Sequence, residues 1–240
     1  MYLYFIRHAQ SENNDLWAKT GSDNGRSHDP ELTQVGKKQA NCLAEFFKGA
    51  ADAFDREREE YPFHKPARLT HVYSSLMVRA VATGNVLAQA LDLPLLGLED
   101  IFEEGGIYLQ DPESGENVGL PGHGEAYFAE NYPNLVLPES MNPAGWWNRD
   151  YELPEERFER AHRALSKMMA LHGGSEDRVG IVSHGGFYTL FLKALLGIKE
   201  EEPCWFTLNN TGITRINFSQ DWVQLAYCNR IDFLLDGLLT

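Results

Sequence analysis

The 240-residue chain is long enough for one sizeable α/β domain, and 43% of its residues are hydrophobic, as in ordinary globular proteins. Its 35 acidic and 21 basic residues give a formal net charge of −14, which argues against a general nucleic-acid or membrane surface but leaves room for a local basic pocket. Three cysteines without metal-ligand spacing, and the absence of a signal peptide or membrane-spanning run, lead us to expect a cytoplasmic protein.

The first structural signal is the apolar run Tyr2–Ile6, which predicts a strand that is buried on both faces. Arg7 and His8 follow it directly. Ligands bind at the carboxyl ends of strands in open α/β sheets. A guanidinium beside an imidazole at this position therefore indicates an anion site with a candidate nucleophile, and an ordinary surface pair is the alternative.

A helix is predicted after this strand end. Residues 13–29 are polar and predict a loop or a short helix. From Leu32 to Ala50, apolar residues recur at helical spacing, and Thr33 is a suitable N-cap, so we expect a helix of about four turns. Residues 52–66 are rich in charge and predict an exposed helix end and linker.

A second strand is predicted at Leu69–Tyr73. The two serines that follow it, at positions 74 and 75, offer an N-cap for a helix with an apolar face over residues 76–91. Arg79 lies about one turn into that helix and can project back over the strand ends. Residues 93–98 predict a further short strand.

The regular alternation breaks at residues 100–145, where Gly and Pro are scattered and no period is sustained. The segment lacks the patterned apolar residues of an independent core. We therefore interpret about 100–150 as a lid inserted into a single domain of residues 1–240. Aromatic residues of this region either line a pocket or serve in packing, and they are Tyr127, Phe128, Tyr132, Trp146 and Trp147.

A third buried strand is predicted at Arg178–Ser183, after a helix that begins at Pro154. His184–Gly186 stands at the end of this strand, and the next helix is terminated by Gly197. Closing strands are predicted at residues 206–208, 212–218 and 222–227, the last two as a hairpin. The alternation predicts a three-layer α/β/α sandwich with a mainly parallel central sheet.

Three predicted strands thus end in chemically active residues at the same edge of one sheet. Two guanidiniums suit a phosphoryl group, because their planar forks match its oxygens and stabilise its charge. A neutral imidazole can attack phosphorus and split a difficult hydrolysis into two steps.

Four motifs in order resemble those of the histidine phosphatase superfamily, which includes the cofactor-dependent phosphoglycerate mutases. Arg7–Asn14 is similar to the family's Arg-His-Gly-x-Ser/Thr-x-x-Asn, and Leu32–Ala40 to its Leu-Thr-x-x-Gly-x-x-Gln-Ala. Ser74–Ala80 and Ser183–Gly186 resemble its two later motifs. The resemblance covers both ends of the chain and leaves mainly the lid unmatched.

The resemblance implies roles for individual residues. His8 would be the phosphorylated nucleophile, and His184 would act beside it in catalysis and bind phosphoryl oxygens. The other phosphate-binding groups would be Arg7, Asn14, Arg79 and the amide of Gly185. Ala9 departs from the pattern, since the family has Gly there; its methyl group is harmless if φ is negative and crowds the phosphate otherwise.

The proton donor to the leaving group would be an acid after the short strand at residues 95–98. Glu103 and Glu104 are the candidates, and we favour Glu103 because Glu-x-Gly-Gly resembles the spacing in some family phosphatases. A solvated acidic turn is the alternative. Partial burial beside a lid would raise a carboxyl pKa and suit acid work, whereas neighbouring cations would oppose that shift.

A metal-independent phosphomonoesterase acting on a small phosphorylated metabolite is the function we expect, with no cofactor, no metal, no nucleic acid and no membrane as partner. Family mutases commonly have His-Gly-Asn at the later histidine and a basic lid, whereas this chain has Gly186 and almost no basic residues between Arg79 and Arg149. Hydrolysis is therefore favoured over mutase-type phosphoryl transfer. Candidates for substrate selection are Lys19, Arg26, His28, His123 and Arg149.

Two other classes remain as alternatives. A metal hydrolase would need ligand spacing such as His-x-His or His-Glu-x-x-His, and the chain has neither. A catalytically weak module that binds a phospho-ligand or a partner is suggested by Ala9 and the unusual lid. A homodimer is compatible with apolar edge strands.

Overall fold

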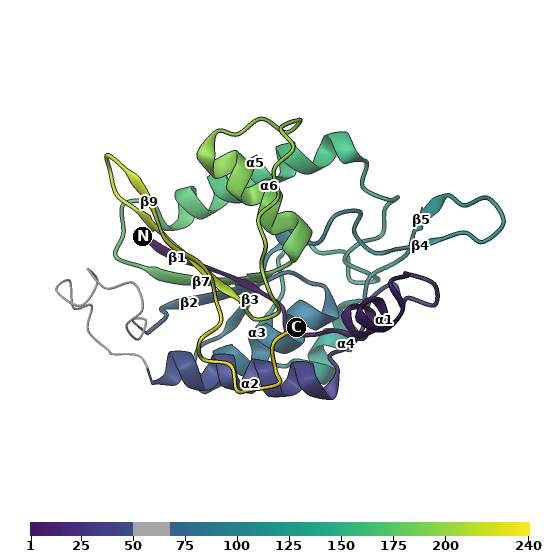
Figure 1. Ribbon diagram of the computed structural model, residues 1–240, viewed down its shortest axis with the longest axis horizontal. Helices are drawn as coiled ribbons and strands as arrows, with labels where there is room; N and C mark the ends of the chain where they lie inside the picture. The colour runs from purple at the N-terminus through teal and green to yellow at the C-terminus, as the bar shows by residue number, and fades with distance from the viewer. Residues whose placement is uncertain (50–67) are drawn as a thin grey trace.

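The computed structural model of the protein describes residues 1–49 and 68–240. A seven-stranded sheet crosses the molecule in the order β6-β3-β2-β7-β1-β8-β9 (Figure 1). Neighbouring strands from β6 to β1 are parallel, whereas β8 and β9 are added antiparallel. The strand bounds are β1 Tyr2–Arg7, β2 His71–Ser74, β3 Leu95–Gly97, β6 Leu135–Val136, β7 Arg178–Ser183, β8 Ile213–Phe218 and β9 Val223–Arg230. The predicted fold class, an α/β sandwich with a mainly parallel central sheet, is confirmed.

Helices cover both faces of this sheet. Figure 1 shows α5 and α6 on one face and α2 and α3 on the other. The helix bounds are α1 Glu12–Thr20, α2 Gln34–Lys48, α3 Val78–Ala90, α4 Glu125–Asn131, α5 Pro154–His172 and α6 Gly185–Leu196.

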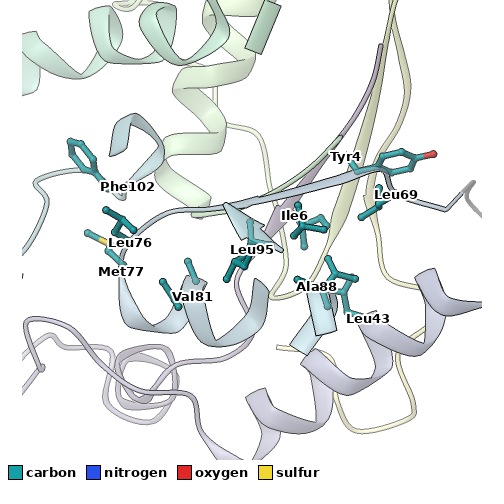
Figure 2. Close-up of a cluster of buried hydrophobic side chains, with 14 of the residues drawn as sticks. Tyr4, Ile6, Leu43, Leu69, Leu76, Met77, Val81, Ala88, Leu95 and Phe102 are labelled. Carbon is teal, nitrogen blue, oxygen red and sulfur yellow. The ribbon is translucent and has the colours of Figure 1, made fainter. Parts of the chain in front are cut away.

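The first strand explains why its sequence is a continuous apolar run. Leu3 and Phe5 pack in the core beneath α5 and α6, whereas Tyr4 and Ile6 pack in the core on the α2 and α3 face. Figure 2 shows Tyr4 and Ile6 in that second core together with Leu43 of α2. Successive side chains point to opposite faces, and since both faces are covered, every position is apolar.

Several predicted elements are confirmed with their caps. The hydroxyl of Thr33 accepts the Gly36 N–H at 3.0 Å and begins α2 as predicted. Gly197 ends α6 with a φ of 66°. The hairpin of β8 and β9 turns through residues 219–222, where the Ser219 N–H donates to the Trp222 carbonyl at 2.9 Å. The charged segment predicted at residues 52–66 lies outside the described residues.

Two local predictions are wrong. The serines at 74 and 75 do not cap α3, because the N-cap position is Met77 and the first helical N–H, that of Val78, donates instead to Oδ1 of Asp29 at 3.0 Å. Residues 206–208 form no strand, because their backbone groups bind side chains rather than a neighbouring strand. The Phe206 N–H donates to the Thr189 hydroxyl, and the Leu208 carbonyl accepts from Arg7.

The segment predicted as a lid is built into the domain. It contains a short 3₁₀ turn at Glu99–Ile101, the two-stranded hairpin β4 Tyr108–Gln110 and β5 Asn117–Gly119, and α4. Its strand β6 pairs with β3 at the edge of the main sheet. Phe128, Trp146 and Trp147 are buried in the main core, so packing is the role of these aromatic residues. Movement of the segment as a lid stays a prediction.

Among the described helices, none combines the length and the apolar character that crossing a bilayer requires.

Candidate active site

The topology brings the three predicted strand ends together. In the sheet, β7 lies between β2 and β1, and all three strands are parallel. His8 follows β1 and its N–H donates to the Ser183 carbonyl at 2.8 Å, while the ring centroids of His8 and His184 lie 5.0 Å apart. Three motifs more than 60 residues apart in sequence therefore share one edge of the sheet.

The hydrogen bonds of His8 define its tautomer. Its Nδ1 lies 2.7 Å from the carbonyl oxygen of Ala9, and since a carbonyl can only accept, Nδ1 carries the proton. Nε2 keeps its lone pair and accepts from Nε of Arg79 at 3.2 Å. Burial, aided by the charges of Arg79 and Arg7, lowers the pKa of His8 well below its ordinary value, so the imidazole is neutral at pH 7.

The charges of two guanidiniums, those of Arg79 and Arg7, act on this ring. Arg79 is 8% exposed, and burial lowers its pKa while the charge of Asp29 opposes that shift. Arg7 donates from Nη1 to the Leu208 carbonyl at 2.7 Å, and burial is also the main cause of its lowered pKa. The buried Nε of Arg7 has no hydrogen-bond partner among the described residues, which leaves a donor for an anion.

His184 lies next to His8 and is fully buried. Its Nε2 is 2.9 Å from the Ser75 hydroxyl, and within the described part of the chain its Nδ1 has no partner. Burial and the charge of Arg79 lower its pKa well below the ordinary value. A ring with one unused nitrogen thus lies beside His8 at this edge of the sheet.

Asn14 holds the turn that carries His8 through hydrogen bonds. Its side-chain oxygen accepts from the Ser11 N–H at 3.1 Å and from the amide of Asn210 at 3.2 Å, and Asn210 also donates to the His8 carbonyl at 2.9 Å. A direct contact of Asn14 with phosphate stays a prediction. Nothing in the local sequence around Asn210 indicated this role.

Other side chains that the sequence did not single out position the backbone after His8. Thr83 accepts the Ala9 N–H at 3.0 Å and donates to the Arg79 carbonyl at 2.8 Å, so one hydroxyl connects the turn after His8 to α3. Ala9 keeps a φ outside the left-handed region and packs against Leu32 and Ala40, so its methyl group is accommodated.

A side chain at position 185 and one at position 186 would each collide with or crowd a different group, so glycine serves a different purpose at the two positions. A Cβ at Gly185 would lie 3.4 Å from Nε of Arg7, so the glycine lets the guanidinium lie against the helix start. A Cβ at Gly186 would lie 2.5 Å from an oxygen of Glu103 and 2.5 Å from an oxygen of Glu104. Gly186 therefore makes space for both candidate acids.

The two acids face different groups. Glu103 accepts the N–H groups of Gly186 at 3.1 Å and Phe187 at 2.9 Å at the start of α6, and its charge raises the pKa of Arg7 against the effect of burial. Glu104 pairs with Arg157 at 2.6 Å, and burial and the charge of Glu103 raise its pKa. Glu103 is thus the acid beside the guanidiniums.

Three of the five side chains proposed for substrate selection have partners in the structure. Lys19 pairs with Asp15 at 2.6 Å on the surface of α1, and the guanidinium of Arg149 lies 4.1 Å from the ring of Trp147. His123 stacks on Tyr127 with ring centroids 3.6 Å apart. Arg26 differs, because it forms no ion pair within the described residues.

One cluster of potential metal ligands occurs among the described residues, formed by His71, His172 and Asp177. His71 begins β2 and Asp177 precedes β7, so the cluster lies at the amino end of the sheet, opposite His8. His172 bonds to Asp177 at 2.8 Å and to the Tyr73 hydroxyl at 3.0 Å. None of the predicted site residues belongs to it.

Comparison with protein families gives a match to the model of the histidine phosphatase superfamily (branch 1) over residues 3–56 and 58–230. The chain is 28% identical over 230 residues to "Putative phosphoserine phosphatase 2" of Hydrogenobacter thermophilus, and the match covers 95% of each chain.

Solved structures show the same fold. The phosphoserine phosphatase of Entamoeba histolytica in complex with 3-phosphoglyceric acid has a TM-score of 0.60 at 22% identity, covering 98% of this chain and 99% of that one. A mycobacterial glucosyl-3-phosphoglycerate phosphatase complexed with VO3 has a TM-score of 0.58 at 17% identity, covering 95% and 98%. The α-ribazole phosphatase of Shigella flexneri has a TM-score of 0.60 at 18% identity, covering 96% of both.

Proposed function

Since the chain belongs to branch 1 of the histidine phosphatase superfamily, we propose that it is a metal-independent phosphomonoesterase that hydrolyses a small phosphorylated metabolite through a phosphohistidine at His8. The observation that carries this proposal is the state of His8. Its Nδ1 donates to the Ala9 carbonyl, its Nε2 accepts from Nε of the buried Arg79, and burial lowers its pKa so that the neutral ring is favoured.

In the first step, Nε2 of His8 attacks phosphorus while the bond from phosphorus to the ester oxygen breaks. The leaving oxygen takes a proton from the acid and departs as an alcohol. In the second step, water attacks the phosphohistidine and gives up a proton to the same carboxylate. Inorganic phosphate leaves and the neutral imidazole returns.

Arg7, Arg79 and His184 would bind the phosphoryl oxygens. The Ser75 hydroxyl accepts the Met77 N–H at 3.3 Å, so its own proton can be donated to Nε2 of His184. That arrangement gives His184 a proton on Nδ1, the nitrogen without a partner among the described residues. The ring would then stabilise the charge that spreads over the phosphoryl oxygens in the transition state.

The proposed phosphohistidine mechanism is tested by detecting the phosphorylated enzyme. Mixing the enzyme with excess p-nitrophenyl phosphate and quenching with alkali should trap one acid-labile phosphohistidine per chain, in the presence of EDTA as well as without it. His8→Asn should show neither the phosphoenzyme nor turnover. Turnover that persists in His8→Asn, or that EDTA abolishes, would contradict the proposal.

Glu103 is proposed as the proton donor, with Glu104 as the matched control one residue away. Glu103→Gln should slow esters of poor leaving groups by about 100-fold, the low end of the range for general acid catalysis, and slow p-nitrophenyl phosphate much less. Glu104→Gln should affect both classes equally. The reverse pattern would assign the proton transfer to Glu104, whose pKa burial raises.

Phosphoserine is the first substrate to test, because relatives of the chain are named as phosphoserine phosphatases. Release of inorganic phosphate supports hydrolysis. Phosphoserine has no second hydroxyl, so the mutase-type alternative is tested with 3-phosphoglycerate. Transfer of its phosphoryl group to the other hydroxyl, measured by ³¹P NMR, would support that alternative.

A further inference from the structure

Three potential metal ligands gather at the amino end of the sheet, and the proposed hydrolysis uses none of them. His71 begins β2, His172 ends α5, and Asp177 directly precedes β7. Each offers one ligand atom, a ring nitrogen or a carboxylate oxygen, and these three atoms lie within 4.8 Å of one another. The ring centroids of the two histidines are 4.7 Å apart. The cluster therefore combines groups from three elements that only the folded chain brings together.

His71 presents a ring nitrogen with a free lone pair. Its Nδ1 lies 2.9 Å from the Thr70 hydroxyl. That hydroxyl accepts the Arg178 N–H at 3.0 Å and donates its only proton to the Arg178 carbonyl at 3.2 Å. Nδ1 of His71 therefore donates to Thr70, and the lone pair is on Nε2. Among the described residues Nε2 of His71 has no hydrogen-bond partner, so this nitrogen is available to a cation.

His172 and Asp177 already lie as two ligands of one ion would. Nδ1 of His172 is 2.8 Å from Oδ2 of Asp177, with a proton between them. A metal ion can take the place of that proton, which is released to solvent, because both atoms then direct lone pairs at the ion. Nε2 of His172 lies 3.0 Å from the Tyr73 hydroxyl. With Nδ1 on the metal, Nε2 carries the ring proton and donates it to Tyr73, the kind of outer hydrogen bond that orients metal-binding histidines.

The spacing of the cluster needs only a small adjustment. Tetrahedral zinc with bonds of about 2.0–2.1 Å holds its ligand atoms about 3.3 Å apart. The pair of His172 and Asp177 is already closer than that, so the adjustment concerns the longer spacings in the cluster. His71 and Asp177 are both partly exposed, and their side chains can turn toward the ion.

The donor set indicates which ion fits. Two imidazoles and one carboxylate suit zinc and neighbouring first-row transition metals, whereas magnesium and calcium prefer oxygen ligands. Three protein ligands leave a fourth tetrahedral position for water.

We propose that His71, His172 and Asp177 bind one divalent transition-metal ion such as zinc, which connects the α5–β7 loop to the start of β2 and stabilises the folded chain. The ion would lie far from the phosphoryl site, because Asp177 precedes β7 and His184 follows it, which separates them by roughly 20 Å along the strand. No step of the proposed hydrolysis passes through this cluster. The inference is therefore independent of the proposed function.

The test is isothermal titration calorimetry of the full chain with zinc, after treatment with EDTA and dialysis. The wild type should bind one zinc ion per chain at this cluster and should not bind magnesium at the same concentrations. His71→Ala should weaken zinc binding by more than about 100-fold, since loss of an outer partner alone costs about 10- to 100-fold. His162→Ala removes an exposed imidazole from α5 and is the matched control, with binding expected to equal that of the wild type.

Thermal unfolding gives a second measurement. Zinc at 100 times its dissociation constant should raise the midpoint of the wild type by about 5–10 °C and leave that of His71→Ala unchanged. Tyr73→Phe should weaken zinc binding by about 10-fold, because the outer hydrogen bond to His172 is lost.

A wild type that binds no zinc, or a His71→Ala protein that binds it equally well, would overturn the proposal. Zinc that blocks hydrolysis of p-nitrophenyl phosphate and is retained by His71→Ala would lie on His8 and His184, and this result would overturn it too. Failure of the proposed function looks different, because a chain without phosphatase activity would still bind zinc at His71 and lose it in His71→Ala.

Discussion

His8 occupies an environment that a charged imidazole would not tolerate. The ring is 3% exposed and receives a hydrogen bond from the guanidinium of Arg79. Burial and like charges act in the same direction, and both lower the pKa of His8 and of His184. The same effects that keep the His8 ring neutral make its protonation costly to the fold.

We predict that acidification destabilises the folded state through these two histidines. In the unfolded chain each takes up a proton near pH 6.5, whereas the folded state does not, so stability is fully present above that pH and is lost below it. The loss should be about 1.4 kcal/mol per pH unit for each histidine.

The measurement is the free energy of unfolding in urea at pH 7.5, 6.5 and 5.5 for the wild type and for His8→Asn. Burial raises the pKa of Asp29 to about 7, and its protonation stabilises the folded state as the pH falls. Both proteins share that opposite contribution, so the difference between them isolates His8. Parallel pH profiles would contradict the prediction.

At the scale of the elements, the motif Leu32–Ala40 both starts α2 and positions the backbone that follows His8. Thr33 caps the helix, and a Cβ at Gly36 would lie 2.1 Å from the carbonyl oxygen of Gln10, so the first turn lies directly against the backbone after His8. One turn later, Gln39 accepts the Gln10 N–H at 2.7 Å. The helix therefore fixes the turn that carries His8.

Gly36→Ala should lower the free energy of unfolding by about 1–3 kcal/mol, because the methyl group overlaps a backbone oxygen that must move. At a helix position with free space the same change would stabilise the protein by about 0.5–1 kcal/mol. The sign of the change in the free energy of unfolding therefore tests the contact. Lys37 is the next residue and is exposed, so Lys37→Ala is the control and should change stability by less than about 0.5 kcal/mol. Thermal and urea unfolding measure both, and a more stable Gly36→Ala protein would refute the contact.

At the scale of the whole molecule, a buried ion pair connects the inserted segment to α5. Arg160 donates to Glu152 through Nε and Nη2, at 2.5 and 2.8 Å, and through Nη1 to the carbonyl of Phe102 at 2.9 Å. Glu152 in turn accepts the Gly105 N–H at 3.3 Å. The loop containing Glu103 thus depends on a charge pair outside the active site.

Arg160→Ala should therefore cost about 3–5 kcal/mol of stability, because it leaves Glu152 buried without its partner. The double variant Arg160→Leu with Glu152→Leu should recover part of this loss, since no charge remains buried. Arg163→Ala removes an exposed arginine from the same helix and should cost less than about 1 kcal/mol. An Arg160→Ala protein as stable as Arg163→Ala in urea would show that the buried pair does not connect the segment.

The local sequence was sufficient to predict an element where that element forms for a local or periodic reason. Tyr2–Arg7 and Arg178–Ser183 are strands because apolar runs fit a sheet covered on both faces, and Thr33 caps α2 through its own third neighbour. The prediction for residues 206–208 was wrong because their backbone partners are the side chains of Arg7 and Thr189, far away in sequence.

The sequence by itself determined the fold class and brought His8, Arg79 and His184 to one edge, because parallel strands must end on the same side of a sheet. Only the tertiary structure decided the protonation site and the hydrogen-bond partners of these groups. The proton of His8 is placed by the Ala9 carbonyl and by Arg79, its backbone is fixed by Asn210 from 202 residues away, and α3 is capped by Asp29. These contacts depend on how separate elements pack against one another, and no local period or spacing in the chain encodes them.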